Sequence, residues 1–244
     1  MVAATSADVV ALQEVTPRTL PLWREALAEA GLGSCCCALD VITAYGRPRP
    51  LGVLTAARSP LERLPGPEVP WPERVVVVRV DGVEVVNLHS PIAPARDLAK
   101  IRTHEAVAAW LSELPPARRV LCGDLNTPRR EFEDGDVMTF AYGSNGRLQA
   151  GRDERWDAAE RALVWGLRQQ GWVDAYRALH GYGDRSASWA YPNGGGWRLD
   201  HVLAYDLEPR AAAYAHEWRQ AGLSDHSALV VDLDAPRTAA GDGA

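Results

Sequence analysis

Lysine is nearly absent from this chain: among its 26 basic residues only Lys100 is a lysine, and the others are arginines. The arginines are scattered without a basic block, and 32 acidic residues leave a formal net charge of −6. Proteins that bind nucleic acid tightly over their whole surface carry an excess of positive charge. The composition therefore excludes that class, although a local basic groove stays compatible with it.

Long apolar runs are also missing, since no stretch approaches the roughly 18 residues that a membrane-spanning helix needs. The first residues contain neither the basic segment nor the apolar core of a secretory signal. No repeat occurs at the periods of solenoids or propellers. We therefore expect a globular protein without a membrane span, and we predict a cytoplasmic location.

Cysteine is scarce and oddly arranged. Cys35, Cys36 and Cys37 are adjacent, and Cys122 stands alone. Adjacent cysteines provide neither a disulfide framework nor the C-x-x-C spacing of a zinc site. We interpret all four as reduced and non-catalytic, which agrees with a reducing compartment. The triplet itself has no explanation in the sequence.

The spacing of apolar residues predicts both helices and strands. Thr19 before Leu20 and Pro21 is a typical helix start, and Gly31 is a typical stop. Asp81 and Gly82 between two valine-rich runs are a strong hairpin signal. We predict helices over 20–30, 97–114 and about 154–170, and strands over 9–12, 75–80, 83–88, 120–122, 199–204 and 228–233.

Valine-rich strands with helices that do not alternate strictly with them favour an α/β sandwich. We expect two mainly antiparallel sheets packed face to face, with helices outside. A doubly wound parallel sheet is less favoured, because the hairpin at Asp81 and Gly82 requires antiparallel neighbours. We expect one domain over residues 1–235 and a disordered tail over 236–244, which is rich in Ala, Gly and Asp.

Ionisable and amide side chains occur where these predicted strands begin or end. Glu14 follows the first strand, Asp124 and Asn126 follow the strand over 120–122, and His226 precedes the last strand. A charge inside a buried strand is costly, so we expect these side chains to gather at strand ends in one site. The full pattern comprises Glu14, Asn87, His89, Asp124, Asn126, Asp200, His201, Asp225 and His226.

The segments that carry this pattern resemble the endonuclease/exonuclease/phosphatase superfamily. They are Leu12-Gln13-Glu14, Asn87-Leu88-His89, Gly123-Asp124-Leu125-Asn126, Leu199-Asp200-His201-Val202 and Ser224-Asp225-His226. The similarity covers roughly residues 8 to 234, and several motifs in the right order are much more specific than any single one. The resemblance implies a four-layered α/β sandwich and metal-assisted hydrolysis of phosphoesters.

The resemblance also implies roles for individual side chains. Asp124 activates the attacking water, and Asn126 holds the phosphate or helps place the metal. His226 contacts a phosphate oxygen or donates a proton, with Asp200 hydrogen-bonded to its ring. His89 is expected to be a further catalytic residue.

The resemblance also suggests which residues contact the metal and the substrate. Glu14 is a hard oxygen ligand that suits Mg²⁺, and Asp225 is a further carboxylate on the metal side. We expect Mg²⁺ as the cofactor, with Mn²⁺ as a substitute. The expected substrate-binding residues are Asn87, Trp189 and Arg96.

Two features depart from the family pattern. The family begins with a strand that carries an Asn near the metal, but here only 13 residues precede Glu14. We interpret the domain as truncated at its N-terminus relative to the family, through a start codon placed too late. In addition, abasic-site endonucleases have a Tyr at the position of His89. A His at this position is more similar to deoxyribonucleases, sphingomyelinases and phosphatases.

The loop over 131–155 is either a substrate-binding segment or disordered.

The leading functional hypothesis is a Mg²⁺-dependent phosphodiester hydrolase, specifically a nuclease acting on DNA. The alternatives are a phosphatase or a phospholipid- or sphingomyelin-directed phosphodiesterase of the same superfamily, and an inactive truncated member. The expected partner is a phosphoester substrate, with nucleic acid favoured, and the expected oligomeric state is a monomer.

Overall fold

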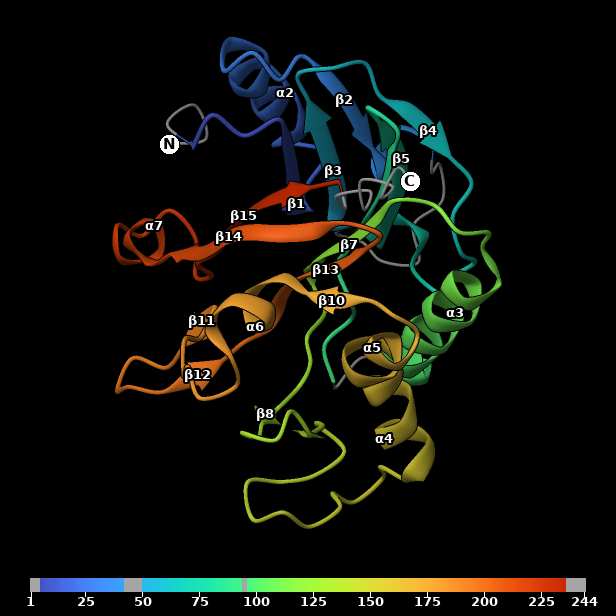
Figure 1. Cartoon of the computed structure of the whole chain (residues 1–244), viewed down its shortest axis with the longest axis vertical. Helices are drawn as coiled ribbons and strands as arrows, with labels where there is room; N and C mark the ends of the chain where they lie inside the picture. The colour runs from blue at the N-terminus through green and yellow to red at the C-terminus, as the bar shows by residue number, and fades with distance from the viewer. Residues whose placement is uncertain (1–4, 42–49, 94–95, 236–244) are drawn as a thin grey trace, which may run out of the picture.

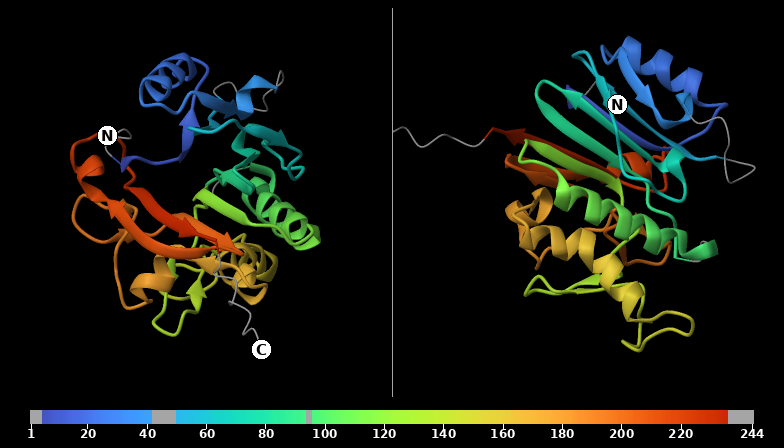
Figure 2. Two further views of the ribbon diagram at one scale, coloured as in Figure 1. Left: turned by 45° about the horizontal axis from the view of Figure 1, so that its top comes forward. Right: turned by 90° about the vertical axis from the view of Figure 1, so that its right-hand side faces the viewer.

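The chain folds into four layers (Figures 1 and 2). The computed structural model describes residues 5–41, 50–93 and 96–235, so the predicted tail over 236–244 lies outside it. Helix α2 (Leu20–Glu29) covers a three-stranded sheet of order β1-β3-β2, and this sheet packs on a six-stranded one. The bounds of the three strands are Val9–Val15 for β1, Gly52–Ala57 for β3 and Ser34–Cys37 for β2.

The six-stranded sheet has the order β10-β13-β7-β6-β5-β4. Its neighbours are antiparallel except β6 and β7, which run parallel, so the expectation of mainly antiparallel sheets is confirmed. The strands are β10 (Val173–Asp174), β13 (Asp200–Tyr205), β7 (Arg119–Asp124), β6 (Val83–Leu88), β5 (Val75–Val80) and β4 (Glu62–Leu64).

The β5–β6 hairpin shows why this sheet is covered on both faces. In β5, Val75 and Val77 pack into the core under the helices, whereas Val76, Val78 and Val80 pack into the core between the two sheets. Side chains of a strand alternate between its two faces, so a run of valines fills both cores.

The turn of this hairpin also agrees with the prediction. Asp81 and Gly82 connect the paired residues Val80 and Val83, and both adopt positive φ, at 48° and 77°. That is the backbone of the two-residue turn that matches strand twist.

Helices α3 (Ala99–Glu113), α4 (Glu154–Arg161) and α5 (Leu167–Gln169) form the outer layer on the six-stranded sheet (Figure 2). Two predictions about them are corrected. The helix expected from Asp97 starts two residues later, because Asp97 and Leu98 have left-handed φ values of 57° and 52°. The helix expected over 154–170 is interrupted by a π-helical turn, Ala162–Gly166, which buries Leu163 and Val164 in the same core.

The remaining elements surround one end of the sandwich. Strands β14 (Glu208–Ala215) and β15 (Ala228–Asp234) form a separate antiparallel ribbon. The segment over 131–155 contains strand β9 and a bridge between Tyr142 and Leu148. The short elements are α6 (Ala175–His180), α7 (His216–Gln220), β8 (Arg130–Glu131), β9 (Val137–Met138), β11 (Trp189–Ala190), β12 (Gly196–Trp197) and the 3₁₀ turns Ala38–Asp40, Pro72–Arg74 and Arg96–Leu98. Within the described ranges, no helix has the length and apolarity to cross a membrane.

Candidate active site

Two carboxylates are brought together by the register of neighbouring strands. Asp124 is the last residue of β7 and Asp200 is the first residue of β13, and the antiparallel register pairs them directly. His226 lies just before β15, and its backbone forms a bridge with Trp189. These polar groups therefore gather at neighbouring strand ends, as the sequence predicted.

Asp200 and His226 form a hydrogen-bonded pair. The Nδ1 atom of His226 lies 2.7 Å from Oδ2 of Asp200, and both side chains are largely buried. Burial by itself lowers the pKa of His226, but the hydrogen bond and negative charge of Asp200 outweigh it and raise the pKa to about 9. The imidazole is therefore charged at neutral pH.

The position of Asp200 is fixed by groups that the sequence did not single out as functional. The buried hydroxyl of Ser188 accepts hydrogen bonds from the backbone N–H groups of Leu199, at 2.9 Å, and Asp200, at 3.1 Å. The Tyr214 hydroxyl donates to the Asp200 carbonyl at 2.7 Å. Ser188 and Trp189 together are a further segment that resembles the family, and that resemblance is the sequence signal for Ser188.

Asp124 is held by a local turn. Its Oδ1 accepts the backbone N–H of Asn126 at 2.8 Å, and its Oδ2 accepts the Asn126 side-chain amide at 3.1 Å. That amide also donates to the carbonyl of Ser90 at 2.8 Å. Burial, together with the negative charge of Asp200, raises the pKa of Asp124 to about 7. A carboxylate with this pKa can accept a proton near neutral pH.

Gly123 permits the close approach of β7 to β6 beside this turn. Its φ is +123°, and a Cβ atom at this position would overlap the carbonyl oxygen of Leu88. Only glycine adopts this backbone conformation without a steric cost. The Gly-Asp-x-Asn motif is therefore explained by its local geometry.

Glu14 extends the cluster from the three-stranded sheet, and His89 extends it from the end of β6 in the six-stranded sheet. The pairing of β1 with β3 is irregular between Leu12 and Val15, Glu14 has a φ of 58°, and its side chain is 63% exposed. The buried His89 lies between the carboxylates, with Nε2 at 3.9 Å from Glu14 Oε1 and 3.7 Å from Asp124 Oδ2. Glu14, His89 and Asp124 therefore come from three different strand ends.

These carboxylates do not form a closed metal cage. In the described part of the chain, no three His, Cys, Asp or Glu side chains are grouped so that they could enclose a metal ion. Asp225 is exposed in the loop before β15. Mg²⁺ keeps several waters and binds through only one or two protein carboxylates. The exposed carboxylate of Glu14 is the kind of oxygen ligand that such an open site uses.

The predicted substrate-binding residues fall in different environments. Asn87 is fully buried, where its amide donates to the carbonyl of Leu54 at 3.1 Å and its Oδ1 accepts from Gln13 at 2.8 Å. Trp189 is half-buried and stacks on Trp197, with 5.0 Å between the ring centroids. Arg96 begins the 3₁₀ turn Arg96–Leu98, and its side chain lies outside the described part.

A buried ion pair beneath the site was missed by the sequence reasoning. Lys100 contacts Glu160 at 2.8 Å, and their side chains are 1% and 0% exposed. Neither residue belongs to a motif, and 60 positions separate them along the chain. The single lysine in the sequence was the only available signal.

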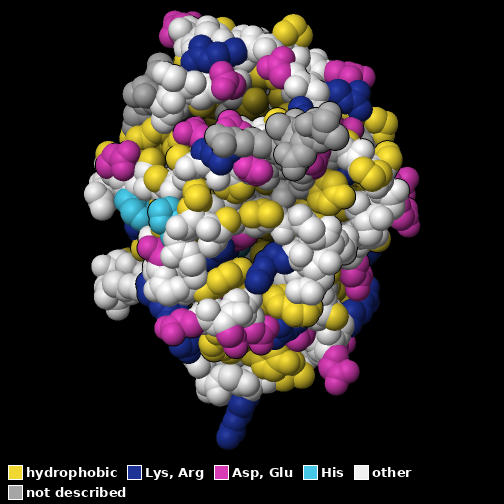
Figure 3. All heavy atoms as spheres, in the orientation of Figure 1, with side chains coloured by type: hydrophobic (Ala, Val, Ile, Leu, Met, Phe, Trp, Pro, Cys, Tyr) yellow, Lys and Arg dark blue, Asp and Glu magenta, His cyan; other side chains and the backbone are white. Residues whose placement is uncertain are grey.

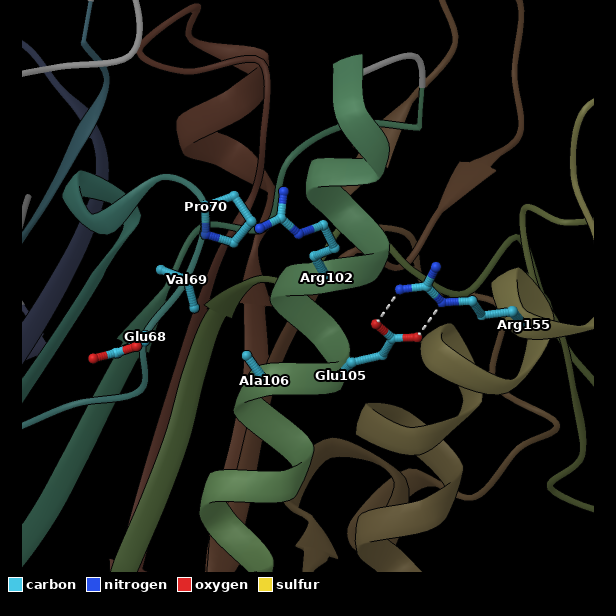
Figure 4. A pocket seen from close by; sticks show the side chains of 7 residues that line it. All are labelled: Glu68, Val69, Pro70, Arg102, Glu105, Ala106 and Arg155. Atoms are coloured by element: carbon cyan, nitrogen blue, oxygen red, sulfur yellow. Dashed lines mark hydrogen bonds and ion pairs between the residues drawn. The ribbon is translucent and has the colours of Figure 1, made fainter.

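A surface hollow of about 550 Å³ lies away from this cluster, between α3 and the segment before β5 (Figure 4). Glu105 and Arg155 form a two-pronged ion pair on its wall, at 2.7 and 2.8 Å. None of the predicted site residues lines it. Acidic and basic side chains are intermixed on the face seen in Figure 3, so no uniformly basic surface marks a partner there.

Comparisons with known proteins find a matching family and similar structures over most of this chain. A family model described as the Endonuclease/Exonuclease/phosphatase family matches residues 1–226. An AP endonuclease from Archaeoglobus fulgidus has a similar structure, with a TM-score of 0.65 and 18% identity over 95% of this chain and 90% of that one. No curated protein is similar enough in sequence to count as a match.

Two further solved structures share the fold. A 3′ phosphatase from Neisseria, bound to product DNA hairpin, has a TM-score of 0.60 and 21% identity over 93% of this chain and 89% of that one. An endonuclease/exonuclease/phosphatase from Beutenbergia cavernae has a TM-score of 0.64 and 19% identity, and the match covers 96% of this chain but 64% of the longer one. These similarities confirm the predicted α/β fold.

Proposed function

Because this chain belongs to the Endonuclease/Exonuclease/phosphatase family, a superfamily of phosphoester hydrolases, we propose that it is a Mg²⁺-dependent phosphodiesterase that cleaves nucleic acid, with DNA as the favoured substrate. The observation that carries this proposal is the paired placement of Asp124 and Asp200 on neighbouring strands, with His226 bonded to Asp200. In this proposal, Asp124 as a base and His226 as a charged imidazole lie beside neighbouring strand ends.

Asp124 is the proposed general base. Its raised pKa of about 7 lets it accept a proton from an attacking water at neutral pH. The two hydrogen bonds from Asn126 hold the carboxylate in one orientation. Asn126 itself is held through Ser90, so the base is fixed before substrate arrives.

His226 is the proposed phosphate-binding group. Because Nδ1 faces Asp200, Nε2 is the ring nitrogen that can meet a phosphate oxygen. The positive charge of the imidazolium stabilises negative charge that develops on the phosphate. Asp200 is a positioning residue in this scheme, since it orients the ring and maintains its charge.

Glu14 would hold the metal ion, together with Asp225 and water. Bound Mg²⁺ would polarise the phosphate and stabilise the leaving oxygen. His89 lies within 3.9 Å of Glu14 Oε1 and 3.7 Å of Asp124 Oδ2, so its proposed role is to keep the two carboxylates at a fixed separation. Asn87 acts indirectly in this proposal, by anchoring Gln13 next to Glu14.

The preference for nucleic acid rests on the aromatic side chains beside His226. Trp189 stacks on Trp197, Tyr191 meets both rings at an angle, and the Trp189 backbone bridges to His226. Aromatic faces bind nucleobases of any sequence by stacking. Two proteins of similar structure, an AP endonuclease and a 3′ phosphatase bound to product DNA hairpin, support the same substrate class.

The test is cleavage of a labelled DNA duplex that contains one abasic site, with Mg²⁺ and with EDTA. We expect cutting that requires the metal, and the cut positions separate abasic-site, internal and terminal cleavage. A panel of phosphodiesters and phosphomonoesters follows on the same protein. Hydrolysis of monoesters alone would replace the nuclease with a phosphatase, and no hydrolysis by the folded protein would contradict the proposal.

A further inference from the structure

The only lysine of the chain is buried directly beneath the turn that carries Asp124 and Asn126. The Nζ atom of Lys100 donates to the backbone carbonyl of Asn126 at 2.7 Å and to Oε1 of Glu160 at 2.8 Å. It also lies 4.9 Å from the centre of the Phe140 ring. The ammonium group therefore connects helix α3, helix α4 and the turn after β7.

Glu160 is the centre of this cluster. Its two oxygens accept hydrogen bonds from the Lys100 ammonium at 2.8 Å, the Trp156 indole at 2.6 Å, the Thr127 hydroxyl at 2.7 Å and the Phe140 backbone at 2.9 Å. A fully buried carboxylate is tolerated only when it is paired and its oxygens are bonded. Thr127 belongs to the same turn as Asp124, so Glu160 provides a second link to that turn.

The turn needs such support because its backbone is not in a relaxed conformation. Asn126 has a φ of 52°, which is unfavourable for residues other than glycine, although less so for Asn. Such backbone persists only where the surroundings determine it. Lys100 at the Asn126 carbonyl and Glu160 at the Thr127 hydroxyl are two of the contacts that do so.

We infer that Lys100, together with Glu160, is a positioning residue that holds the segment 124–127 in its catalytic conformation. This inference rests on the proposed function, because it requires Asp124 to be the base. Lysine suits this fully buried position, because its ammonium is a compact point charge that reaches the Asn126 carbonyl and Glu160 together.

The chain provides a matched control at the other end of β7. Arg119 is also buried, at 3% exposed, and it likewise donates to one carboxylate, Glu84, and one backbone carbonyl, Pro115. Arg119 is the first residue of β7, whereas Asp124 is the last. Lys100→Met and Arg119→Met therefore remove equivalent buried charges, but only the first contacts the proposed catalytic turn.

The experiment compares kcat, KM and backbone hydrogen exchange in the wild type, Lys100→Met and Arg119→Met. We expect Lys100→Met to lower kcat per folded molecule by about 10²-fold, the effect of a misplaced catalytic group, with KM changed by less than about threefold. Exchange should rise at residues 124–127 in this variant only. Arg119→Met should lose stability but keep its kcat.

A milder variant covers the case in which Lys100→Met does not fold. Thr127→Val removes one hydrogen bond to Glu160 with little change of volume, and we expect about a tenfold loss of kcat, equivalent to one hydrogen bond to a charged group. Unchanged kcat in both Lys100→Met and Thr127→Val would overturn the inference, as would an equal loss in Arg119→Met. If the wild type hydrolyses no phosphoester, the proposed function fails, and hydrogen exchange alone decides whether Lys100 holds the turn.

Discussion

The Nδ1 atom of His226 lies 2.7 Å from Oδ2 of Asp200, although 26 residues separate them in the sequence. The contact raises the pKa of His226 and leaves Nε2 as the ring nitrogen that the proposal assigns to phosphate binding. Across the strand pair, Asp124 is the register partner of Asp200. One carboxylate therefore raises the pKa of both an acid and a base, and this coupling leads to the first two predictions.

The kcat of the wild type should have a bell-shaped pH profile, with an acidic limb and an alkaline limb. The base Asp124 must be deprotonated, so kcat should fall as pH drops through about 7. The imidazolium of His226 must be protonated, so kcat should fall as pH rises through about 9. Initial rates measured between about pH 5 and 10 cover both pKa values and therefore both limbs. A rate that stays constant across this range would exclude both assignments.

Asp200→Asn should move both limbs to lower pH. Loss of the negative charge removes the main interaction that raises the pKa of His226, and it removes one interaction that raises the pKa of Asp124. The pH profile of this variant is compared with that of Asp232→Asn, which changes an exposed carboxylate on β15. A variant whose alkaline limb stays at the wild-type position would show that Asp200 does not control His226.

Gly123→Ala should destabilise the protein strongly. The added Cβ would overlap the Leu88 carbonyl, and the φ of +123° is outside the range that alanine adopts. We expect a loss of more than about 2 kcal/mol of unfolding free energy, measured by urea denaturation. Gly82→Ala is the control, because Gly82 also has a positive φ, of 77°, but its Cβ would meet open space. Its expected loss is about 1 kcal/mol; equal losses would contradict the steric explanation.

Glu14→Gln should increase the Mg²⁺ concentration needed for half-maximal activity without affecting the fold. The side chain is 63% exposed, so removing its charge should cost little stability. Activity is titrated with Mg²⁺, and thermal melting is measured in parallel. Glu25→Gln, on the exposed face of α2, is the control and should leave the titration unchanged. An unaltered Mg²⁺ requirement in Glu14→Gln would remove Glu14 from the metal site.

Local signals in the sequence were sufficient for much of the fold. The hairpin over 75–88 has the predicted turn, because Asp81 and Gly82 accept the positive φ that the turn needs. The strand-end location of Asp124 and Asp200 was also predictable, since burying charges within a strand is costly. These inferences depend on residues close together in the sequence.

Features that depend on distant residues were not predictable in the same way. The contact between Lys100 and Glu160 joins two helices with 60 positions between them, and no local pattern specifies it. The π-helical turn at Ala162–Gly166 follows from packing on the sheet, whereas propensity alone favoured one continuous helix. From the sequence, Asn87 was predicted to contact substrate at a strand end. In the structure the three-stranded sheet buries it completely, and its amide donates to the Leu54 carbonyl instead.

The most direct test of the account is the turnover of Asp124→Asn on whichever phosphoester the wild type cleaves. Asparagine keeps the shape and one oxygen acceptor but cannot take a proton, so we predict a loss of kcat of at least about 10²-fold. Thermal melting should show at most a small loss of stability, because one hydrogen bond from Asn126 is lost but a buried negative charge beside Asp200 is removed as well. Asp232→Asn should keep the wild-type rate. An Asp124→Asn protein that turns over at the wild-type rate would contradict the central claim that this carboxylate activates the attacking water.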